Sequence, residues 1–178
     1  LPAFQRLLAK GSIGGWGLTG IGLPQVLIGA LDSGLRPAAI QVIANLLDSP
    51  GGLKRFEGPA IPRLIIEAAG RAGVPVMGIR AVQAGALTNA LDRPLADDHP
   101  EMVDYRRAAP FRELAARVGP TPAALAHRYA LSMPGIATVV LGVKNRAELA
   151  ECVAAEAADP LSAGLIARID IAASRGAA

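Results

Sequence analysis

Residues 61–79 have the sequence IPRLIIEAAGRAGVPVMGI, which changes partway from one apolar period to another. In its first part the apolar residues recur at the spacing of one helical face: Ile61, Leu64, Ile65 and Ala68. Gly73 ends that pattern, and a short apolar run follows. The stretch therefore predicts a helix over residues 61–72 and a buried strand over residues 74–79.

The same pattern extends along the chain on both sides. It predicts strands at residues 13–18, 38–43 and 138–141, and helices at residues 3–9, 24–33, 109–118, 122–132, 146–156 and 162–174. The connection at residues 81–108 is too long for an ordinary turn, which predicts a functional or mobile loop. Strands that alternate with helices indicate parallel βα units. Four such units fit either a doubly wound open sheet or half of a (β/α)₈ barrel, and periodicity does not decide between them.

The composition excludes several classes of protein. A mean hydropathy of +0.37 excludes intrinsic disorder, and no apolar run is long enough for a transmembrane helix. Cys152 is the only cysteine, which excludes a disulfide scaffold. The net charge is +3, but the cations are scattered apart from Arg106 and Arg107, which argues against nucleic-acid binding. We therefore expect a soluble, cytoplasmic protein with no nucleic-acid or membrane partner. Because the chain begins at Leu1 rather than at a methionine, we expect that further residues precede it.

The segment Gly142–Glu148 follows the last predicted strand and begins a helix. Free N–H groups and the positive end of the helix dipole favour an anion there, a phosphate above all, and Lys144 and Arg146 add positive charge. A capping box formed by Asn145 and Glu148 accounts for the same residues without a ligand. The two interpretations are compatible.

Other polar residues carry weaker indications. Gln41 lies in an otherwise apolar strand, and a buried amide without a partner costs about 1–3 kcal/mol, so it needs a ligand amide or, more commonly, a backbone group. Residues 15–20 match G-x-G-x-x-G, but the first glycines fall inside the predicted strand and no acidic residue follows at the required distance, which argues against a Rossmann site. Neither His99 nor His127 has the partner spacing of a zinc helix.

Taken in order, five segments resemble the C-terminal half of the aldo-keto reductases. They are residues 10–19, 40–48, 76–88, 121–136 and 142–152, which are similar to the family patterns GKIRxxGVSN, QVxYNLLD, VxAYSPLxxGLLT, TPAQLALRWxLxxPGV and GxxNxxQLxEN. The resemblance implies that residues 1–178 form a single domain: strands five to eight of a (β/α)₈ TIM barrel and its C-terminal helix. It also implies an extended nicotinamide dinucleotide, NADP by default, with NAD as the alternative.

The resemblance assigns residues to the two ends of that cofactor. Thr19 and Gln41 would hold the nicotinamide carboxamide, Ile79 stands where the family has a stacking aromatic residue, and Arg80 lies in the diphosphate region. The residues that match the adenosine end are Gly142, Lys144, Glu148, Glu151 and Cys152. Cys152 replaces the usual Asn. A Glu148 carboxylate about 4 Å from a 2′-phosphate would be unfavourable by about 1–4 kcal/mol.

By the same resemblance, the chain would be the cofactor-binding half of an NAD(P)H-dependent oxidoreductase that reduces aldehydes or ketones to alcohols. The catalytic Tyr of the family lies on the first four strands, and neither Tyr105 nor Tyr129 matches its motif. We therefore assign no catalytic residue and expect the chain alone to be inactive. The alternative is a non-catalytic half-barrel that binds nucleotide, or that completes a barrel with a second copy or an N-terminal half, because four open strands leave two unpaired edges.

Overall fold

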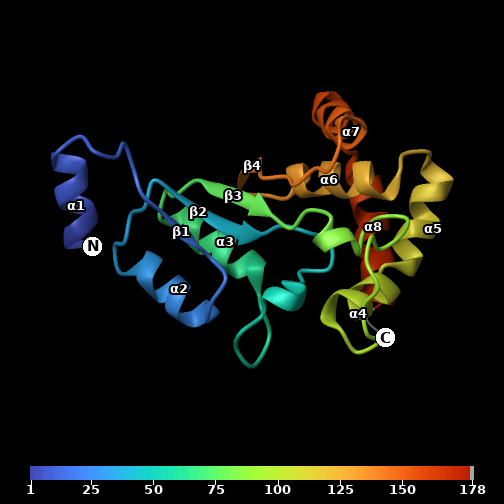
Figure 1. The fold of residues 1–178 in the computed structure, drawn as a ribbon, viewed down its shortest axis with the longest axis horizontal. Coiled ribbons are helices and arrows are strands. Elements are labelled where there is room, and N and C mark those ends of the chain that lie inside the picture. Colours follow the sequence, from blue (N-terminus) through green and yellow to red (C-terminus); the bar gives the residue numbers. More distant parts are fainter. Residues whose placement is uncertain (177–178) are drawn as a thin grey trace.

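The computed structural model describes residues 1–176 and contains one parallel sheet with helices between its strands (Figure 1). The strands are β1 (Gly17–Thr19), β2 (Ala39–Ile43), β3 (Val76–Ile79) and β4 (Ile136–Val139). The α-helices are α1 (Pro2–Ala9), α2 (Pro24–Asp32), α3 (Pro62–Arg71), α4 (Pro100–Arg107), α5 (Ala109–Val118), α6 (Pro122–Ser132), α7 (Arg146–Ala157) and α8 (Ala163–Arg175). Two short 3₁₀ helices, η1 (Gly51–Leu53) and η2 (Gln83–Gly85), follow β2 and β3.

The order of the strands decides between the two architectures. The sheet runs β1-β2-β3-β4, so every connection leads to the adjacent strand in the same direction. A doubly wound sheet reverses its strand order at a switch point, and this sheet does not. The fold is therefore α/β, with parallel βα units that form half of a (β/α)₈ barrel.

Helices cover one face of the sheet, and the other face is open. Side chains alternate between the faces along each strand, and Ile40, Val42 and Val76 are buried against the helices. Figure 1 shows α2 and α3 side by side beneath the strands, on that covered side. The opposite face carries a row of four residues in register on neighbouring strands, half-buried or exposed: Thr19, Gln41, Met77 and Thr138. We call this the open face.

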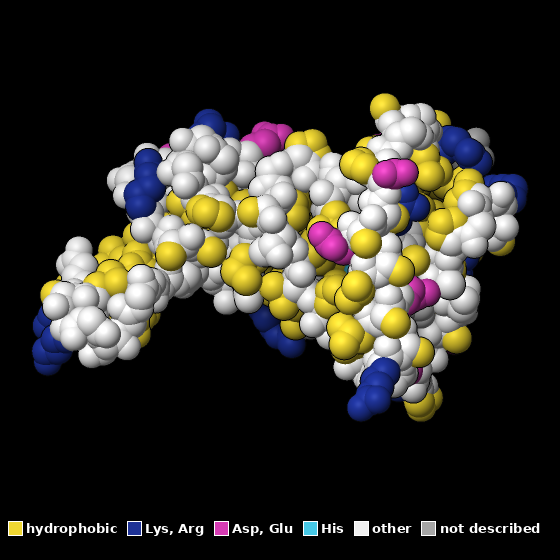
Figure 2. Space-filling view, turned by 90° about the horizontal axis from the view of Figure 1, so that it is seen from above, with side chains coloured by type: hydrophobic (Ala, Val, Ile, Leu, Met, Phe, Trp, Pro, Cys, Tyr) yellow, Lys and Arg dark blue, Asp and Glu magenta, His cyan; other side chains and the backbone are white. Residues whose placement is uncertain are grey.

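The helix α1 stands apart from the rest of the structure (Figure 1). None of its residues is buried, and Figure 2 shows its hydrophobic side chains on the surface. The Phe4 ring stacks on the Trp16 ring, with 5.4 Å between the ring centres and an interplanar angle of 3°. This aromatic contact joins α1 to the segment that leads into β1.

The predicted helices are confirmed to within one residue at each end, but the strands and the long connection need correction. The strand predicted at residues 13–18 occupies only Gly17–Thr19, so Gly15 precedes the strand instead of lying inside it. The strand predicted at residues 138–141 begins two residues earlier, at Ile136. Residues 81–108 are not all loop, because η2 and α4 lie within them. Apolar periodicity missed α4 because two acidic residues, Glu101 and Asp104, occupy its buried positions.

No described helix has the length and apolar character that crossing a membrane requires.

A buried tyrosine ties three helices together on the covered side. The Tyr129 hydroxyl on α6 donates a hydrogen bond to Asp170 Oδ1 on α8 at 2.5 Å and accepts one from Arg63 Nη2 on α3 at 2.8 Å. Arg63 Nε also donates to Asp48 Oδ2, just after β2, at 2.7 Å. Burial and the Asp170 carboxylate raise the pKa of Tyr129 to about 12, so this hydroxyl stays protonated as a structural donor.

We expect Tyr129→Phe to lower the free energy of unfolding by about 1–3 kcal/mol, because it removes two hydrogen bonds and leaves their partners unpaired in a half-buried setting. Urea titration followed by circular dichroism measures the change. Tyr105→Phe is the matched control: its hydroxyl donates only to the exposed Asn89 carbonyl, so it should cost less. Equal effects of the two substitutions would contradict the structural role of Tyr129.

Candidate functional site

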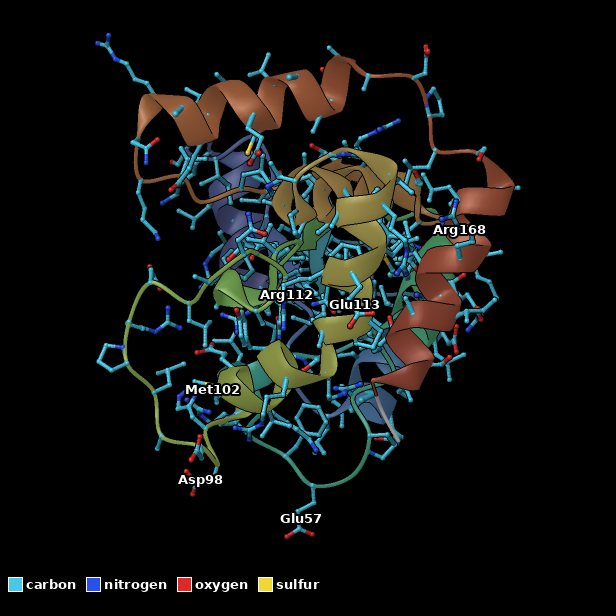
Figure 3. All side chains as sticks on the ribbon, turned by 90° about the vertical axis from the view of Figure 1, so that its right-hand side faces the viewer. Glu57, Asp98, Met102, Arg112, Glu113 and Arg168 are labelled. Atoms are coloured by element: carbon cyan, nitrogen blue, oxygen red, sulfur yellow. The ribbon has the colours of Figure 1, made fainter. Side chains whose placement is uncertain are left out.

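The carboxyl ends of the strands and the loops that follow them gather at one end of the molecule. Figure 3 looks onto this end, with Met102 of α4 and Asp98 on one side and Arg168 of α8 on the other. Ligands of open parallel sheets and of (β/α)₈ barrels bind at the carboxyl ends of the strands. A functional site is therefore expected at this end of the molecule.

A cavity of about 660 Å³ lies between the loop after β3 and the segment that joins β4 to α7. Its size lies within the range of small-molecule sites. Five residues that the sequence assigned to the adenosine end line it together: Gly142, Lys144, Glu148, Glu151 and Cys152. Thr88, Asp92 and Arg93 come from the loop after β3, and Thr121 and His127 come from α6. We call this the β4–α7 cavity.

The start of α7 is capped by its own side chains. Asn145 Oδ1 accepts a hydrogen bond from the Glu148 N–H at 3.0 Å, as the capping box predicts. The Glu148 carboxylate accepts from the Lys144 N–H at 2.8 Å and from Asn145 Nδ2 at 3.2 Å. A carboxylate of the chain therefore already occupies part of the position that an incoming phosphate would use.

An ion pair closes one side of the β4–α7 cavity. Lys144 Nζ lies 2.6 Å from Asp92 Oδ2, and Arg93 Nη2 lies 2.7 Å from Glu101 Oε2 of α4. The hydrogen bond from Lys144 lowers the pKa of Asp92, and the same bond raises the pKa of Lys144, so both groups stay charged at neutral pH. The pair holds the loop after β3 against the segment after β4.

A buried histidine and a buried thiol form the inner wall of the cavity. Cys152 Sγ lies 3.4 Å from His127 Nε2, and His127 Nδ1 has no hydrogen-bond partner among the described residues. Burial lowers the pKa of His127 and raises the pKa of Cys152, so both groups are neutral near pH 7. Beside them, the Thr121 hydroxyl donates to Glu151 Oε1 at 2.5 Å. No sequence pattern indicated that His127 belongs to this site, although it lies on α6, the helix that Thr121 caps.

The residues assigned to the nicotinamide end lie elsewhere. Thr19 and Gln41 are in register on the open face, as a shared ligand contact requires. Gln41 is half-buried rather than buried, and its side chain makes no hydrogen bond with the described residues. Ile79, at the end of β3, is also half-buried. None of the three lines the β4–α7 cavity.

Arg80 is held in a separate network. Its Nη2 donates to Glu101 Oε1 at 2.6 Å, and its Nε donates to Gln83 Oε1 at 3.2 Å. A positive φ of 64° at Arg80 accompanies this arrangement. Its guanidinium is therefore already engaged by Glu101 and Gln83, and the assignment of Arg80 to the diphosphate region stays a prediction.

The described residues include no cluster of three or more His, Cys, Asp or Glu side chains that could hold a metal ion. The two tyrosine hydroxyls are engaged with Asp170, Arg63 and the Asn89 carbonyl. The arrangement is a binding site whose walls combine apolar and polar side chains. We assign no acid or base to it.

The chain is similar to known oxidoreductases over nearly all of its length. Residues 1–174 match the family model described as "Aldo/keto reductase family". The solved holo structure of aldo-keto reductase AKR11C1 from Bacillus halodurans has 22% identity and a TM-score of 0.68, covering 96% of this chain and 54% of that chain. The glycerol dehydrogenase AKR11B4 from Gluconobacter oxydans has 18% identity and a TM-score of 0.69, covering 97% of this chain and 52% of that chain. The chain thus spans about half the length of these solved structures, and no curated protein matches its sequence.

The lowered pKa of His127 predicts a pH dependence of stability. In the unfolded chain His127 binds a proton near pH 6.5, whereas in the folded chain it does so only at lower pH. The contribution of neutral His127 to the free energy of unfolding is therefore fully present above about pH 6.5 and is lost on acidification. We expect the free energy of unfolding to fall between pH 7.5 and 5.5, by at most about 1.4 kcal/mol per pH unit for one proton. His127→Leu should flatten this slope in urea titrations.

The second histidine of the chain supplies the control for this experiment. His99→Asn keeps a capping side chain at the start of α4 and leaves His127 in place, so the slope due to His127 should persist. An unchanged slope in His127→Leu would contradict the assignment.

Proposed function

This chain belongs to the aldo/keto reductase family, and on that premise we propose that it is the cofactor-binding half, strands five to eight, of a barrel that reduces aldehydes or ketones. The observation that carries the proposal is the β4–α7 cavity, because it brings together the five residues assigned to the adenosine end. The four sheet strands with one open face support the barrel geometry. Residues 1–178 would form a single domain of it.

The described residues fit a nicotinamide dinucleotide at both ends. The adenosine end would lie in the β4–α7 cavity, and the nicotinamide carboxamide would meet Thr19 and Gln41 on the open face. Because the Gln41 amide is not bonded to described residues, its donors and acceptor are available to another amide. When bound, the reduced nicotinamide supplies the hydride for the carbonyl carbon. This chain would bind and orient the cofactor, and Ile79 would offer it an apolar contact.

The choice between NADP and NAD depends on Glu148. NADP is the usual cofactor of the family, and we propose it here with NAD as the alternative. The Glu148 carboxylate would lie near the 2′-phosphate, and Lys144, which could offset it, is paired with Asp92. The two forms of the cofactor differ only in that phosphate, so one carboxylate can alter the preference.

We expect Glu148→Gln to tighten NADPH binding about 3- to 10-fold relative to NADH, because it removes one negative charge at the partly solvated edge of the site. Isothermal titration calorimetry of both cofactors measures the ratio. Glu156→Gln, an exposed position of the same helix outside this cavity, is the matched control and should leave the ratio unchanged. A ratio that is equal in the two variants would place the 2′-phosphate away from Glu148.

We expect the 178-residue chain to bind the dinucleotide without reducing carbonyls, since the catalytic Tyr of the family is assigned to strands one to four. The loss of reduced-nicotinamide absorbance in the presence of aldehydes and ketones measures turnover. Turnover that copurifies with this polypeptide would contradict the assignment of the chain as a cofactor-binding half. Failure of both NADPH and NADH to bind would contradict the proposal as a whole.

A second candidate function is barrel completion by association. Among the described residues, β1 pairs only with β2 and β4 pairs only with β3, so each outer strand has an unpaired edge. The exposed apolar side of α1 adds surface that a neighbour could cover: Leu1, Phe4, Leu7 and Leu8. Light scattering distinguishes the outcomes, because a dimer supports pairing with a second copy, whereas a monomer that dimerises only with an N-terminal half supports complementation.

The substrate class is proposed from the family, and the location is proposed from the composition. We propose a small carbonyl substrate as the partner of the complete barrel and a cytoplasmic location, which the single cysteine favours.

A further inference from the structure

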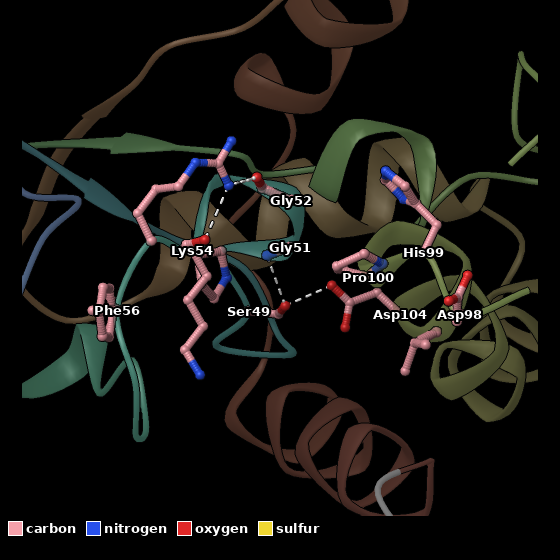
Figure 4. A pocket seen from close by; sticks show the side chains of 12 residues that line it. Ser49, Gly51, Gly52, Lys54, Phe56, Asp98, His99, Pro100 and Asp104 are labelled. Atoms are coloured by element: carbon pink, nitrogen blue, oxygen red, sulfur yellow. Dashed lines mark hydrogen bonds between the residues drawn. The ribbon is translucent and has the colours of Figure 1, made fainter. Parts of the chain in front are cut away.

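We infer that a second cavity, between residues 49–56 and the start of α4, binds a small organic carboxylate with an aromatic or aliphatic body. The cavity measures about 710 Å³ and shares no lining residue with the β4–α7 cavity. It follows β2 and β3, so it opens at the same carboxyl end of the sheet (Figure 4). We call it the β2–α4 cavity, and the inference does not depend on dinucleotide binding.

Two cations on one wall are available to an anion. The Lys54 side chain forms no ion pair with any described residue, and its Nζ lies 5.7 Å from the centre of the Phe56 ring. Arg55 Nη1 donates only to the carbonyls of Gly52 at 2.6 Å and Lys54 at 3.0 Å. Both cations therefore lack a carboxylate partner within the described part of the chain.

The acidic group at the base of the cavity is already neutralised. Asp104 Oδ2 accepts hydrogen bonds from the Ser49 hydroxyl at 2.5 Å and from Gln83 Nε2 at 2.7 Å, and Asp104 Oδ1 accepts from Arg107 Nη1 at 3.0 Å. The other carboxylate of the lining, Asp98, is exposed. The lining therefore contains two cations without a carboxylate partner and one exposed carboxylate, and this excess of positive charge favours a negatively charged ligand.

The opposite wall adds a neutral donor and an apolar surface. His99 Nδ1 accepts the Glu101 N–H at 3.2 Å, so a neutral His99 carries its proton on Nε2 and can donate it to a ligand. Pro100 and Val103 supply apolar groups on this wall, and Phe56 adds an apolar ring on the wall of the cations. Cations and apolar groups in the same lining suit a carboxylate attached to an apolar body better than inorganic phosphate.

The base of the cavity is rigid, which lowers the cost of ordering a ligand site. Gly51 has φ +53°, and a side chain there would place its Cβ 2.6 Å from Gln83 Nε2 and 2.9 Å from Arg80 Nη2. Glu101 is held between Arg80 at 2.6 Å and Arg93 at 2.7 Å. The loop after β2 is therefore packed closely onto a fixed ionic network.

The chain has only three lysines, Lys10, Lys54 and Lys144, so NMR of the protein with ¹³C-dimethylated lysines reports on each region separately. We expect benzoate to shift the Lys54 signal until the site is saturated and to leave the signals of Lys10 and Lys144 unchanged. Benzamide, which has the same shape without the charge, should bind more weakly. Lys54→Met should weaken benzoate binding about 3- to 10-fold in ligand-observed NMR, and Lys10→Met should leave it unchanged.

Several outcomes would overturn the inference. If benzamide and benzoate bind equally well, the negative charge of the ligand does not contribute to binding. If inorganic phosphate displaces benzoate as well as benzoate itself does, the apolar body does not contribute. Unchanged benzoate binding in both Lys54→Met and His99→Asn would place the ligand elsewhere. The dinucleotide proposal is tested independently in the same sample, because 2′-AMP should shift Lys144. A Lys144 signal that stays in place would count against that proposal alone.

Discussion

The structure depends on a constraint of handedness: a helix that connects two adjacent parallel strands crosses the sheet on a fixed side. Because the four strands occur in chain order, the connections cover the same face, where Ile40, Val42 and Val76 are buried. The row from Thr19 to Thr138 on the other face is then not covered by these connecting helices, and its side chains are half-buried or exposed in the described part of the chain. Parallel sheets are normally covered on both faces, so this surface is suited to a ligand, to further strands, or to both.

A second constraint is the ionic network at the carboxyl end. Glu101 is buried, and its two carboxylate oxygens form ion pairs with Arg80 and Arg93. Two positive charges therefore compensate its negative charge. The pKa of Glu101 is lowered by these two guanidinium groups despite the opposing effect of burial. Arg93 lines the β4–α7 cavity, and the backbone N–H of Glu101 bonds His99 of the β2–α4 cavity. The two cavities therefore share one rigid boundary, although they share no lining residue.

The helices were predictable because their apolar periodicity and caps are local. Thr121 and Asn145 cap α6 and α7 with the side-chain bonds that their positions predict. The helix α4 was not predictable by this route, because its buried positions hold acidic residues whose charges are balanced by arginines distant in sequence. Likewise, local spacing carries no signal for the hydrogen bond between Arg80 and Glu101, which lies twenty-one residues later.

The sequence by itself determined that the chain alternates strands and helices, where most of the helices begin and end, and that Asn145 and Glu148 cap the helix after the last strand. Those properties depend on residues within one turn or one strand of each other. Only the tertiary structure decided that the sheet is singly wound, that His127 meets Cys152 in the β4–α7 cavity, and that Arg80 is engaged. Each of these depends on which distant elements lie side by side, and local spacing carries no information about that packing.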